Sequence, residues 1–207
     1  GYDLAHYDEL FSEKLELLLA INKKESLSWQ GQHRPSFENK GIYPRPYNAY
    51  IPVWIAVGGT PSSVVRAATL NLPLMIAILG SSPAAFTRLT DLYKNTLKKE
   101  HPGADYQLGI NEHLYIAETA EQARDEYWPV YGPMMNGIGR ERGWPPMHRQ
   151  QFDMLCEYEG SLMVGSPDDI ISKLTYQYGL FKNTRFLAQI IFGNIPFEKV
   201  RKSIELF

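Results

Sequence analysis

The residues best suited to chemistry lie in one short turn, Gly58-Gly59-Thr60-Pro61-Ser62-Ser63. Glycines let a backbone approach a ligand closely, and a helix that begins after them offers free N–H groups at the positive end of its dipole. Thr60, Ser62 and Ser63 add hydroxyl donors, and the turn holds no carboxylate that would repel an anion. The pattern suits a phosphate group. A helix capped by Thr60 after a tight turn would explain the same residues without a ligand.

Two further helix starts provide a comparison. In Ser166-Pro167-Asp168-Asp169 two carboxylates already complement the helix dipole, so no anion is expected to bind there. Gly80-Ser81-Ser82-Pro83 lacks acidic residues and is a weaker phosphate candidate, for which a plain N-cap is the simpler interpretation. The turn at residues 58–63 is therefore the main candidate.

The histidines supply a weak catalytic candidate. His113 follows Asn111 and Glu112 in a run that is otherwise apolar. Inside a barrel, His113 or Asn111 would lie near a bound ring. The alternative is a polar layer whose hydrogen bonds are satisfied within the protein. The five histidines show no metal-ligand spacing, so no metal site is predicted.

A single cysteine and a charged tripeptide complete the candidates. Cys156 is interpreted as a small buried hydrophobe rather than a nucleophile. Because it is the only cysteine, no intramolecular disulfide can form, which favours a reducing compartment, the cytoplasm. Arg140, Glu141 and Arg142 could bind an anionic ligand, with a solvated charge cluster as the usual alternative.

Alternating strands and helices must position these residues. Apolar runs at residues 53–57, 74–79, 108–117 and 186–192 predict four parallel strands with helices between them, the first strand being buried on both faces. An amphipathic helix is expected at Tyr7–Ile21 and a loop at Asn136–Met147. The fold class is therefore α/β. It is either a small open domain or half of a (β/α)8 barrel, since a full barrel typically takes roughly 250 residues.

Composition excludes several classes of protein. The net charge of −2 and the pI of about 6.2 give no basic surface for nucleic acid. No apolar run approaches the roughly 18 residues that a membrane span needs, so neither nucleic acid nor membrane is expected as a partner. With 207 residues, 44% of them apolar, the chain is long enough for one domain with a substantial core.

Several separated segments resemble the bacterial luciferase-like flavin monooxygenases. They are Ile42–Pro46, Pro52–Pro61, Gly139–Pro146 and the ending from Gly165 to Leu206. The resemblance implies a TIM (β/α)8 barrel of the luciferase-like type. Gly1-Tyr2-Asp3-Leu4 resembles the middle of family members, so residues 1–207 are expected to be the C-terminal half of a single barrel domain and not to fold stably alone.

The resemblance also implies an activity. The chain would belong to a flavin-dependent monooxygenase, an oxidoreductase that uses reduced FMN and oxygen to oxidise an organic substrate, with F420 as the alternative cofactor. The flavin phosphate would be held by Gly58, Gly59, Thr60, Ser62 and Ser63. Ala77–Leu79 would lie near the flavin, and the loop at Asn136–Met147 could cover it. The implied partners are a small organic substrate, a flavin reductase that supplies reduced flavin and, as one option, a second copy in a homodimer.

Two other functions fit the sequence. One is a non-catalytic flavin-binding protein of the same barrel family. The other is a phosphosugar isomerase or aldolase, which would be expected to carry a lysine or carboxylate at a strand end. Val57 and Leu79 stand at those positions, which counts against the second alternative.

Overall fold

A computed structural model describes residues 3–207, which form two compact units. The first unit ends at Val53, and the second is Trp54–Phe207. Residues 1 and 2, which begin the segment that resembles the middle of family members, lie outside the described residues. The expectation of a single barrel domain stays a prediction.

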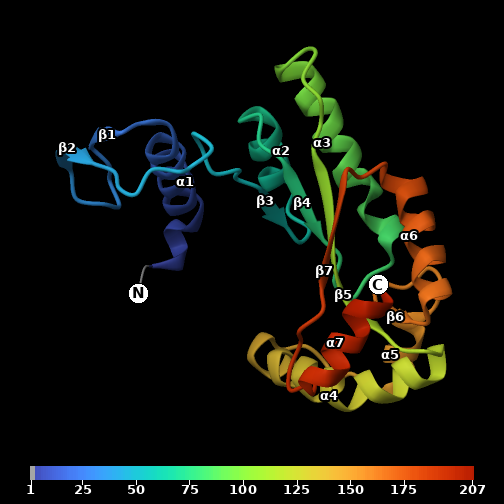
Figure 1. Ribbon diagram of the computed structural model, residues 1–207. Coiled ribbons are helices and arrows are strands. Elements are labelled where there is room, and N and C mark those ends of the chain that lie inside the picture. Colours follow the sequence, from blue (N-terminus) through green and yellow to red (C-terminus); the bar gives the residue numbers. More distant parts are fainter. Residues whose placement is uncertain (1–2) are drawn as a thin grey trace. The chain divides into compact units, whose positions relative to one another are not determined.

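The first unit consists of one long helix and a two-stranded sheet (Figure 1). A short 3-10 turn, η1 (Leu4–His6), leads into α1 (Tyr7–Lys23), which confirms the expected amphipathic helix. β1 (Ser26–Trp29) pairs antiparallel with β2 (Phe37–Gly41). The polar sequence of β2 gave no apolar alternation from which a strand could be predicted.

A proline-containing segment is fastened to the end of α1. The Arg45 guanidinium donates hydrogen bonds to the backbone carbonyls of Ile21, Asn22 and Lys24, at 3.0, 3.1 and 2.8 Å. The Asn22 side chain exchanges two further hydrogen bonds, at 2.7 and 2.8 Å, with the backbone of Ile51. The last carbonyls of a helix lack partners within it and attract a cation, so Arg45 is well placed to stabilise this end of α1.

The second unit is built on a five-stranded parallel sheet. Its strands are β3 (Ile55–Val57), β4 (Leu74–Ala77), β5 (Leu108–Ile116), β6 (Met163–Gly165) and β7 (Arg185–Gln189). β3, β4 and β5 are successive neighbours, and both β6 and β7 pair with β5. The sequence predicted four of these strands and missed β6, because three apolar residues directly before a helix start do not stand out as a strand.

Helices join the strands and cover the sheet (Figure 1). They are α2 (Pro61–Thr69), the 3-10 turn η2 (Pro83–Phe86), α3 (Thr87–Glu100), α4 (Ala120–Arg142), α5 (Arg149–Cys156), α6 (Pro167–Phe181) and α7 (Phe197–Leu206). Strands and helices alternate along the second unit, which confirms the α/β class.

The alternation of side chains along β5 divides the core in two. Tyr115 packs with the buried aromatic residues of α4 and α5, together with Val164 of β6. Leu114 and Ile116 point the other way and pack with Ile170 of α6. The end of β5 is therefore covered by helices on both faces.

The beginning of the sheet is covered less completely. Ala56 is exposed between the buried residues Ile55 and Val57, so the prediction that this strand is buried on both faces is wrong for the chain described. The register places Leu187 on the same face as Ala56, and Leu187 is 49% exposed. Met75 and Gly109 lie between them on this face and are buried, so the face is covered in part and is exposed at Ala56 and Leu187.

The predicted loop at residues 136–147 is wrong for most of its length. α4 continues to Arg142 and ends at Gly143, whose φ of 70° is the left-handed conformation that glycine adopts most readily. Only the residues after it form a loop. Asn136 holds that returning segment through two side-chain hydrogen bonds, at 2.7 and 3.3 Å, with the backbone of Met147.

Tertiary packing explains why α4 persists through glycines and prolines. Tyr127 and Tyr131 are fully buried in the aromatic core and anchor the helix on both sides of Pro129. Gly132 lies under the ring of Trp128, and a Cβ there would approach the ring atoms to 2.7 Å. Burial of this aromatic face outweighs the roughly 1 kcal/mol by which each glycine disfavours a helix.

We expect Arg45→Met to release residues 45–51 from the end of α1, since it removes three charge-assisted hydrogen bonds, at a cost of about 1.5–3 kcal/mol. The measurement is hydrogen exchange at the Ile51 amide in the complete protein, because this amide donates to Asn22. Arg34→Met is the matched control, since Arg34 lies over the Phe37 ring and makes none of these bonds. Unchanged exchange at Ile51 in Arg45→Met would refute the role assigned to Arg45.

Candidate functional site

The turn at residues 58–63 lies between the end of β3 and the first turn of α2, as the sequence predicted. The carboxyl ends of parallel strands are where α/β proteins bind ligands. Four of the five candidate residues are exposed, namely Gly58, Gly59, Thr60 and Ser62. The fifth, Ser63, is half-buried. The structure therefore brings all five together at an accessible edge of the sheet.

Thr60 occupies the N-cap position of α2 but does not cap the helix with its side chain. At the starts of α4 and α6, the Thr119 side chain accepts the N–H of Gln122 at 3.2 Å and the Ser166 side chain accepts that of Asp169 at 3.4 Å, whereas α1, α3 and α7 begin, like α2, without a side-chain cap. The first-turn N–H groups of α2 have no carbonyl acceptors within the helix. They and the Thr60 hydroxyl are thus placed to receive a ligand.

The two glycines leave the space above the turn open. Gly59 has a φ of 150°, a backbone conformation that residues with a Cβ rarely adopt. A Cβ built on either Gly58 or Gly59 would meet no atom within 4 Å. Gly58 has no positive φ, so a side chain there should disturb folding little while it occupies the room that a ligand would need.

The charges at the helix starts differ in the way the sequence predicted. The first turn of α2 has no acidic residue, whereas that of α6 has Asp168 and Asp169. The Asp169 carboxylate accepts the Ser166 N–H at 2.9 Å and so completes a capping box. Near Gly80, the four-residue turn η2 leads directly into α3, with no side-chain cap from Ser82 and no acidic residue in the first turn. Of the three starts, α2 is the one that begins directly as an α-helix without an acidic residue in its first turn.

Two of the polar residues of β5 point to opposite faces of the sheet. Asn111 donates from Nδ2 to the Leu187 carbonyl of β7 at 2.9 Å. Glu112 points to the face covered by α6, where both its oxygens accept hydrogen bonds from Gln177 Nε2 at 2.9 Å. Asn111 therefore links two strands, and Glu112 links a strand to a helix.

His113, the weak catalytic candidate, lies in the aromatic core. It is 5% exposed, and its ring centroid is 5.6 Å from that of Tyr131 and 4.4 Å from that of Phe192. Among the described residues its Nδ1 has no hydrogen-bond partner, so the alternative of a fully satisfied polar layer is not met. Burial lowers the pKa of His113 to about 4, which makes it a neutral imidazole at neutral pH.

The remaining candidates lie apart from the turn. Cys156 is buried, and burial raises the pKa of its thiol to about 12, as befits a packing residue. Arg140 and Arg142 are exposed on the last turn of α4 rather than in a loop, and the Arg142 guanidinium lies 5.3 Å from the Trp144 ring centroid. At the end of β4, Ala77 is half-buried, in keeping with a position at an accessible edge.

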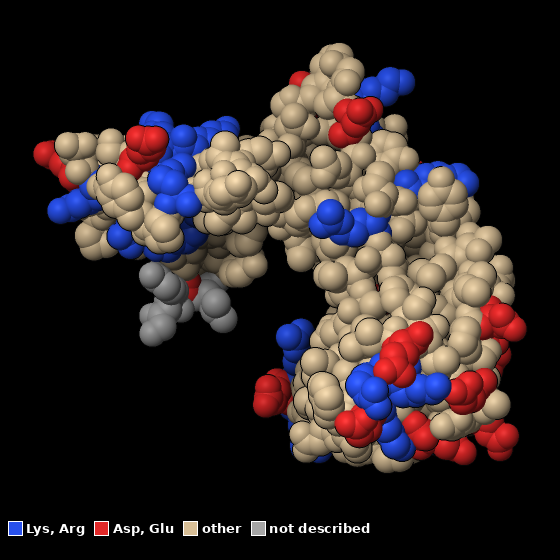
Figure 2. Space-filling view, viewed as in Figure 1, with Lys and Arg blue, Asp and Glu red and all other residues tan. Residues whose placement is uncertain are grey.

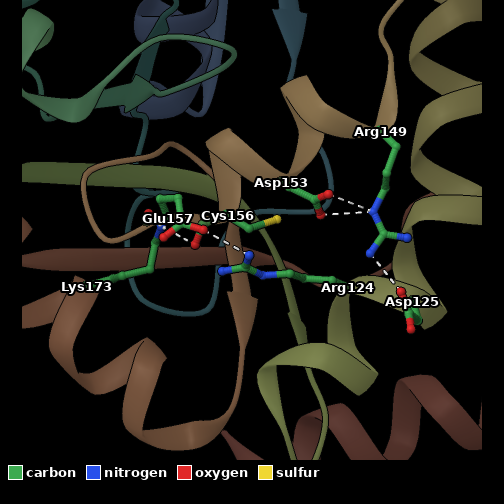
Figure 3. A network of polar contacts seen from close by, with 7 residues as sticks. All are labelled: Arg124, Asp125, Arg149, Asp153, Cys156, Glu157 and Lys173. Atoms are coloured by element: carbon green, nitrogen blue, oxygen red, sulfur yellow. Dashed lines mark hydrogen bonds and ion pairs between the residues drawn. The ribbon is translucent and has the colours of Figure 1, made fainter.

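A network of ion pairs joins α4 to α5 (Figure 3). Arg149 lies between Asp125, at 2.7 Å, and Asp153, at 2.9 Å, while Arg124 pairs with Glu157 at 2.9 Å. These carboxylates are thus paired with arginines. Within the described residues, no group of three His, Cys, Asp or Glu side chains could hold a metal ion.

The visible surface of the helical end of the second unit carries mixed charge. Figure 2 shows positive and negative side chains interspersed there, around α4 and α7. On α7, Arg201 pairs with Glu198 and Glu205, and Lys202 pairs with Glu118. This face therefore has no single-sign field to attract a polyanion. In the part of the chain that the structure describes, no helix has the length and hydropathy to cross a membrane.

Two residues that face Glu112 were not singled out from the sequence. Lys173 and Gln177 lie one turn apart on the buried side of α6, in line with Ile170 and Phe181. Their spacing is the signal that could have identified them, since polar residues at the buried phase of an amphipathic helix need a buried partner.

The family model for luciferase-like monooxygenases matches residues 1–181. The chain belongs to this family, and its parallel sheet and helices are part of a luciferase-like barrel. A search of curated proteins gives no match.

Solved structures of this family share the fold at low sequence identity. The chain matches monooxygenase RslO1 from Streptomyces bottropensis with a TM-score of 0.78 and 20% identity, over 99% of this chain and 60% of that one. It matches the oxygenating constituent of 3,6-diketocamphane monooxygenase from Pseudomonas putida, in complex with FMN, with a TM-score of 0.69 and 13% identity, over 100% and 68%. An F420-dependent secondary alcohol dehydrogenase matches with a TM-score of 0.64 and 9% identity, over 91% and 58%.

Acid should destabilise the protein through His113. The folded-state pKa of about 4 lies below the usual 6.5, so protonation opposes folding. The contribution of neutral His113 to the stability of the folded protein is fully present above pH 6.5 and is lost as the pH falls through 4. It amounts to at most about 3 kcal/mol. We expect His113→Phe to lose this part of the pH dependence, as measured by urea unfolding of the complete protein between about pH 7 and pH 4.

His148→Asn is the control for this experiment. His148 is exposed at the N-cap of α5, where asparagine caps well, so the variant removes a surface imidazole and keeps the helix start. Its acid dependence should equal that of the parent. If His113→Phe also keeps the acid dependence of the parent, burial of His113 is not its cause.

Proposed function

We propose that the chain is part of a flavin-dependent monooxygenase, which uses reduced FMN and oxygen to oxidise a small organic substrate. Family membership supports an oxidoreductase of this type. The observation that carries the cofactor proposal is the start of α2, where exposed glycines, hydroxyl groups and first-turn N–H groups meet without a carboxylate.

The residues of this turn fit a phosphate group. The backbone N–H groups of Ser62 and Ser63 would donate to phosphate oxygens, and the hydroxyls of Thr60, Ser62 and Ser63 would add further donors. Gly58 and Gly59 keep the approach free, since a Cβ on either would project into open space. The positive end of the α2 dipole favours the negative charge. When bound, the reduced flavin supplies the redox chemistry with oxygen.

FMN is proposed in preference to F420 because of the charge on its phosphate. FMN ends in a phosphate monoester, which carries up to two negative charges, whereas the phosphate of F420 is a diester with one. The positive end of a helix stabilises the more highly charged group more strongly. A flavin reductase would supply the reduced cofactor, and a homodimer is compatible with this proposal.

The phosphate site is tested with Gly58→Asp, which adds a carboxylate at the turn without a strained φ. We expect the dissociation constant for FMN, measured by titration into the complete protein, to rise at least about tenfold through repulsion between two anions. Gly179→Asp is the control, since Gly179 is an exposed glycine of α6 whose Cβ would also meet open space. It makes the same change of charge away from the turn and should leave FMN affinity unchanged.

Two smaller changes refine the test. Ser63→Ala should weaken FMN binding by about 1 kcal/mol, or roughly fivefold, as expected for one lost hydrogen bond. Ser166→Ala should lower stability through the cap of α6 and leave FMN affinity intact. If Gly58→Asp binds FMN as tightly as the parent, the turn is only a helix start and the proposed site is wrong.

Catalysis is tested separately from binding. FMN is bound to the complete protein and reduced under anaerobic conditions. The sample is then exposed to oxygen in the presence of an organic substrate. Incorporation of an oxygen atom into the substrate supports the monooxygenase. Tight FMN binding without any substrate oxidation would instead indicate a flavin-binding protein that has lost catalysis.

A further inference from the structure

Three polar side chains are buried between β5 and α6, away from the proposed phosphate site. Glu112 is 0% exposed, and Lys173 and Gln177 are each 2% exposed. Charged side chains are almost never fully buried unless they are paired, because removal from water costs several kcal/mol. The arrangement of this group therefore needs a specific explanation.

Among the residues that the structure describes, Glu112 has one hydrogen-bonding partner, the amide of Gln177. Gln177 Nε2 donates to both of its oxygens, each at 2.9 Å. Within the described residues, no cation comes close enough to Glu112 to form an ion pair. One neutral donor compensates poorly for a buried negative charge. Burial raises the pKa of Glu112 to about 8, against the hydrogen bond from Gln177 and the charge of Lys173, which lower it.

Lys173 makes its contacts at the end of α5 instead. Its Nζ donates to the carbonyl of Cys156 at 3.3 Å and to that of Glu157 (Figure 3). Carbonyls at the end of a helix suit a cation, because the negative end of the dipole lies there. Burial nevertheless lowers the pKa of Lys173 to about 8, against the attraction of Glu112, the largest opposing effect.

Other charged groups around Lys173 come from α4 and α5. Arg124 of α4 opposes its positive charge, and Glu157 favours it, but these two form an ion pair with each other at 2.9 Å. The thiol of Cys156 also faces Lys173, and burial raises its own pKa to about 12, so it is neutral. Glu112 and Lys173 are thus the two titrating groups of this cluster near neutral pH.

The amide of Gln177 supports a proton on Glu112. Its Oε1 is buried and has no hydrogen-bond partner in the described structure. A carboxylic acid carries an O–H that needs an acceptor, and the nitrogen and oxygen of an amide differ little in shape. Rotation of the amide exchanges its two atoms and brings Oε1 to the present position of Nε2, 2.9 Å from both carboxyl oxygens, where it can accept the Glu112 O–H. The Glu112 O–H and Gln177 Oε1 then satisfy each other.

We propose that Glu112, Gln177 and Lys173 form a proton-linked clamp between β5, α6 and the end of α5. In the clamp, Glu112 is a neutral carboxylic acid at neutral pH and Lys173 is a cation held by two carbonyls. Loss of the Glu112 proton leaves a buried carboxylate with one amide donor and weakens the contact of α6 with β5. The clamp acts independently of the proposed flavin site.

The clamp predicts a particular dependence of stability on pH. The folded-state pKa of Glu112 is above its ordinary 4.5, so its contribution is fully present below 4.5 and is lost as the pH rises through about 8. That of Lys173 is below its ordinary 10.5, so its contribution is fully present above 10.5 and is lost as the pH falls through about 8. The contribution of the clamp to the stability of the folded protein should therefore be smallest near pH 8.

Infrared spectroscopy of the complete protein tests the proton directly. At about pH 6, well below the raised pKa, the spectrum should contain the C=O stretching band of a buried protonated carboxyl group. This band should disappear with a midpoint near pH 8 and be absent from Glu112→Gln. If the parent and Glu112→Gln have the same carboxyl bands at about pH 6, Glu112 is ionised and the proposal is overturned.

Thermal unfolding tests the consequence for stability. Glu112→Gln keeps a neutral hydrogen-bonding group, so its Tm should match that of the parent near pH 5 and exceed it increasingly as the pH rises to about 8. Glu118→Gln is the control, because Glu118 is an exposed carboxylate paired with Lys202 at 2.7 Å, and its Tm difference should not grow over this range. A constant Tm difference between Glu112→Gln and the parent contradicts the clamp.

Discussion

Hydrogen bonding along β5 is the interaction on which the second unit depends. β4 and β7 pair with its first part, and β6 pairs with its last three residues, 114–116. Because side chains alternate along a strand, this one segment also supplies both halves of the core. Its hydrophobic residues face α4 and α5 on one side and α6 and α7 on the other. A break in β5 would separate three strands and both hydrophobic clusters at once.

Local patterns made much of this fold predictable. The apolar runs gave β3, β4, β5 and β7, and helical periodicity gave α1, because these signals lie within short windows of sequence. The errors have a common physical origin in contacts that are distant in sequence. α4 passes through Gly137 and Gly139 because the aromatic face of the helix is buried, and Ala56 is exposed because the rest of the second unit covers its face only in part.

Among the candidate site residues, too, local patterns could be predicted from the sequence and contacts between distant residues could not. The turn at residues 58–63 could be predicted because a glycine pair, a hydroxyl and a proline at a strand end form a local pattern. The partners of Glu112 could not, since Gln177 lies 65 residues further along the chain. A polar residue in an apolar strand indicates only that a partner is needed, and the packing of α6 determines which residue it is. His113 shows the same limit, because its neighbours come from α4 and from beyond β7.

The enclosed position of Cys156 has a practical consequence. It is the only cysteine among the 207 residues, and its side chain is shut between the helices of the aromatic core. A thiol reagent reacts with thiolate that is accessible to solvent, and burial here suppresses both accessibility and ionisation. The rate of modification by such a reagent would therefore follow the opening of the aromatic core that encloses Cys156. The chain thus contains a natural chemical reporter for local unfolding of its aromatic core.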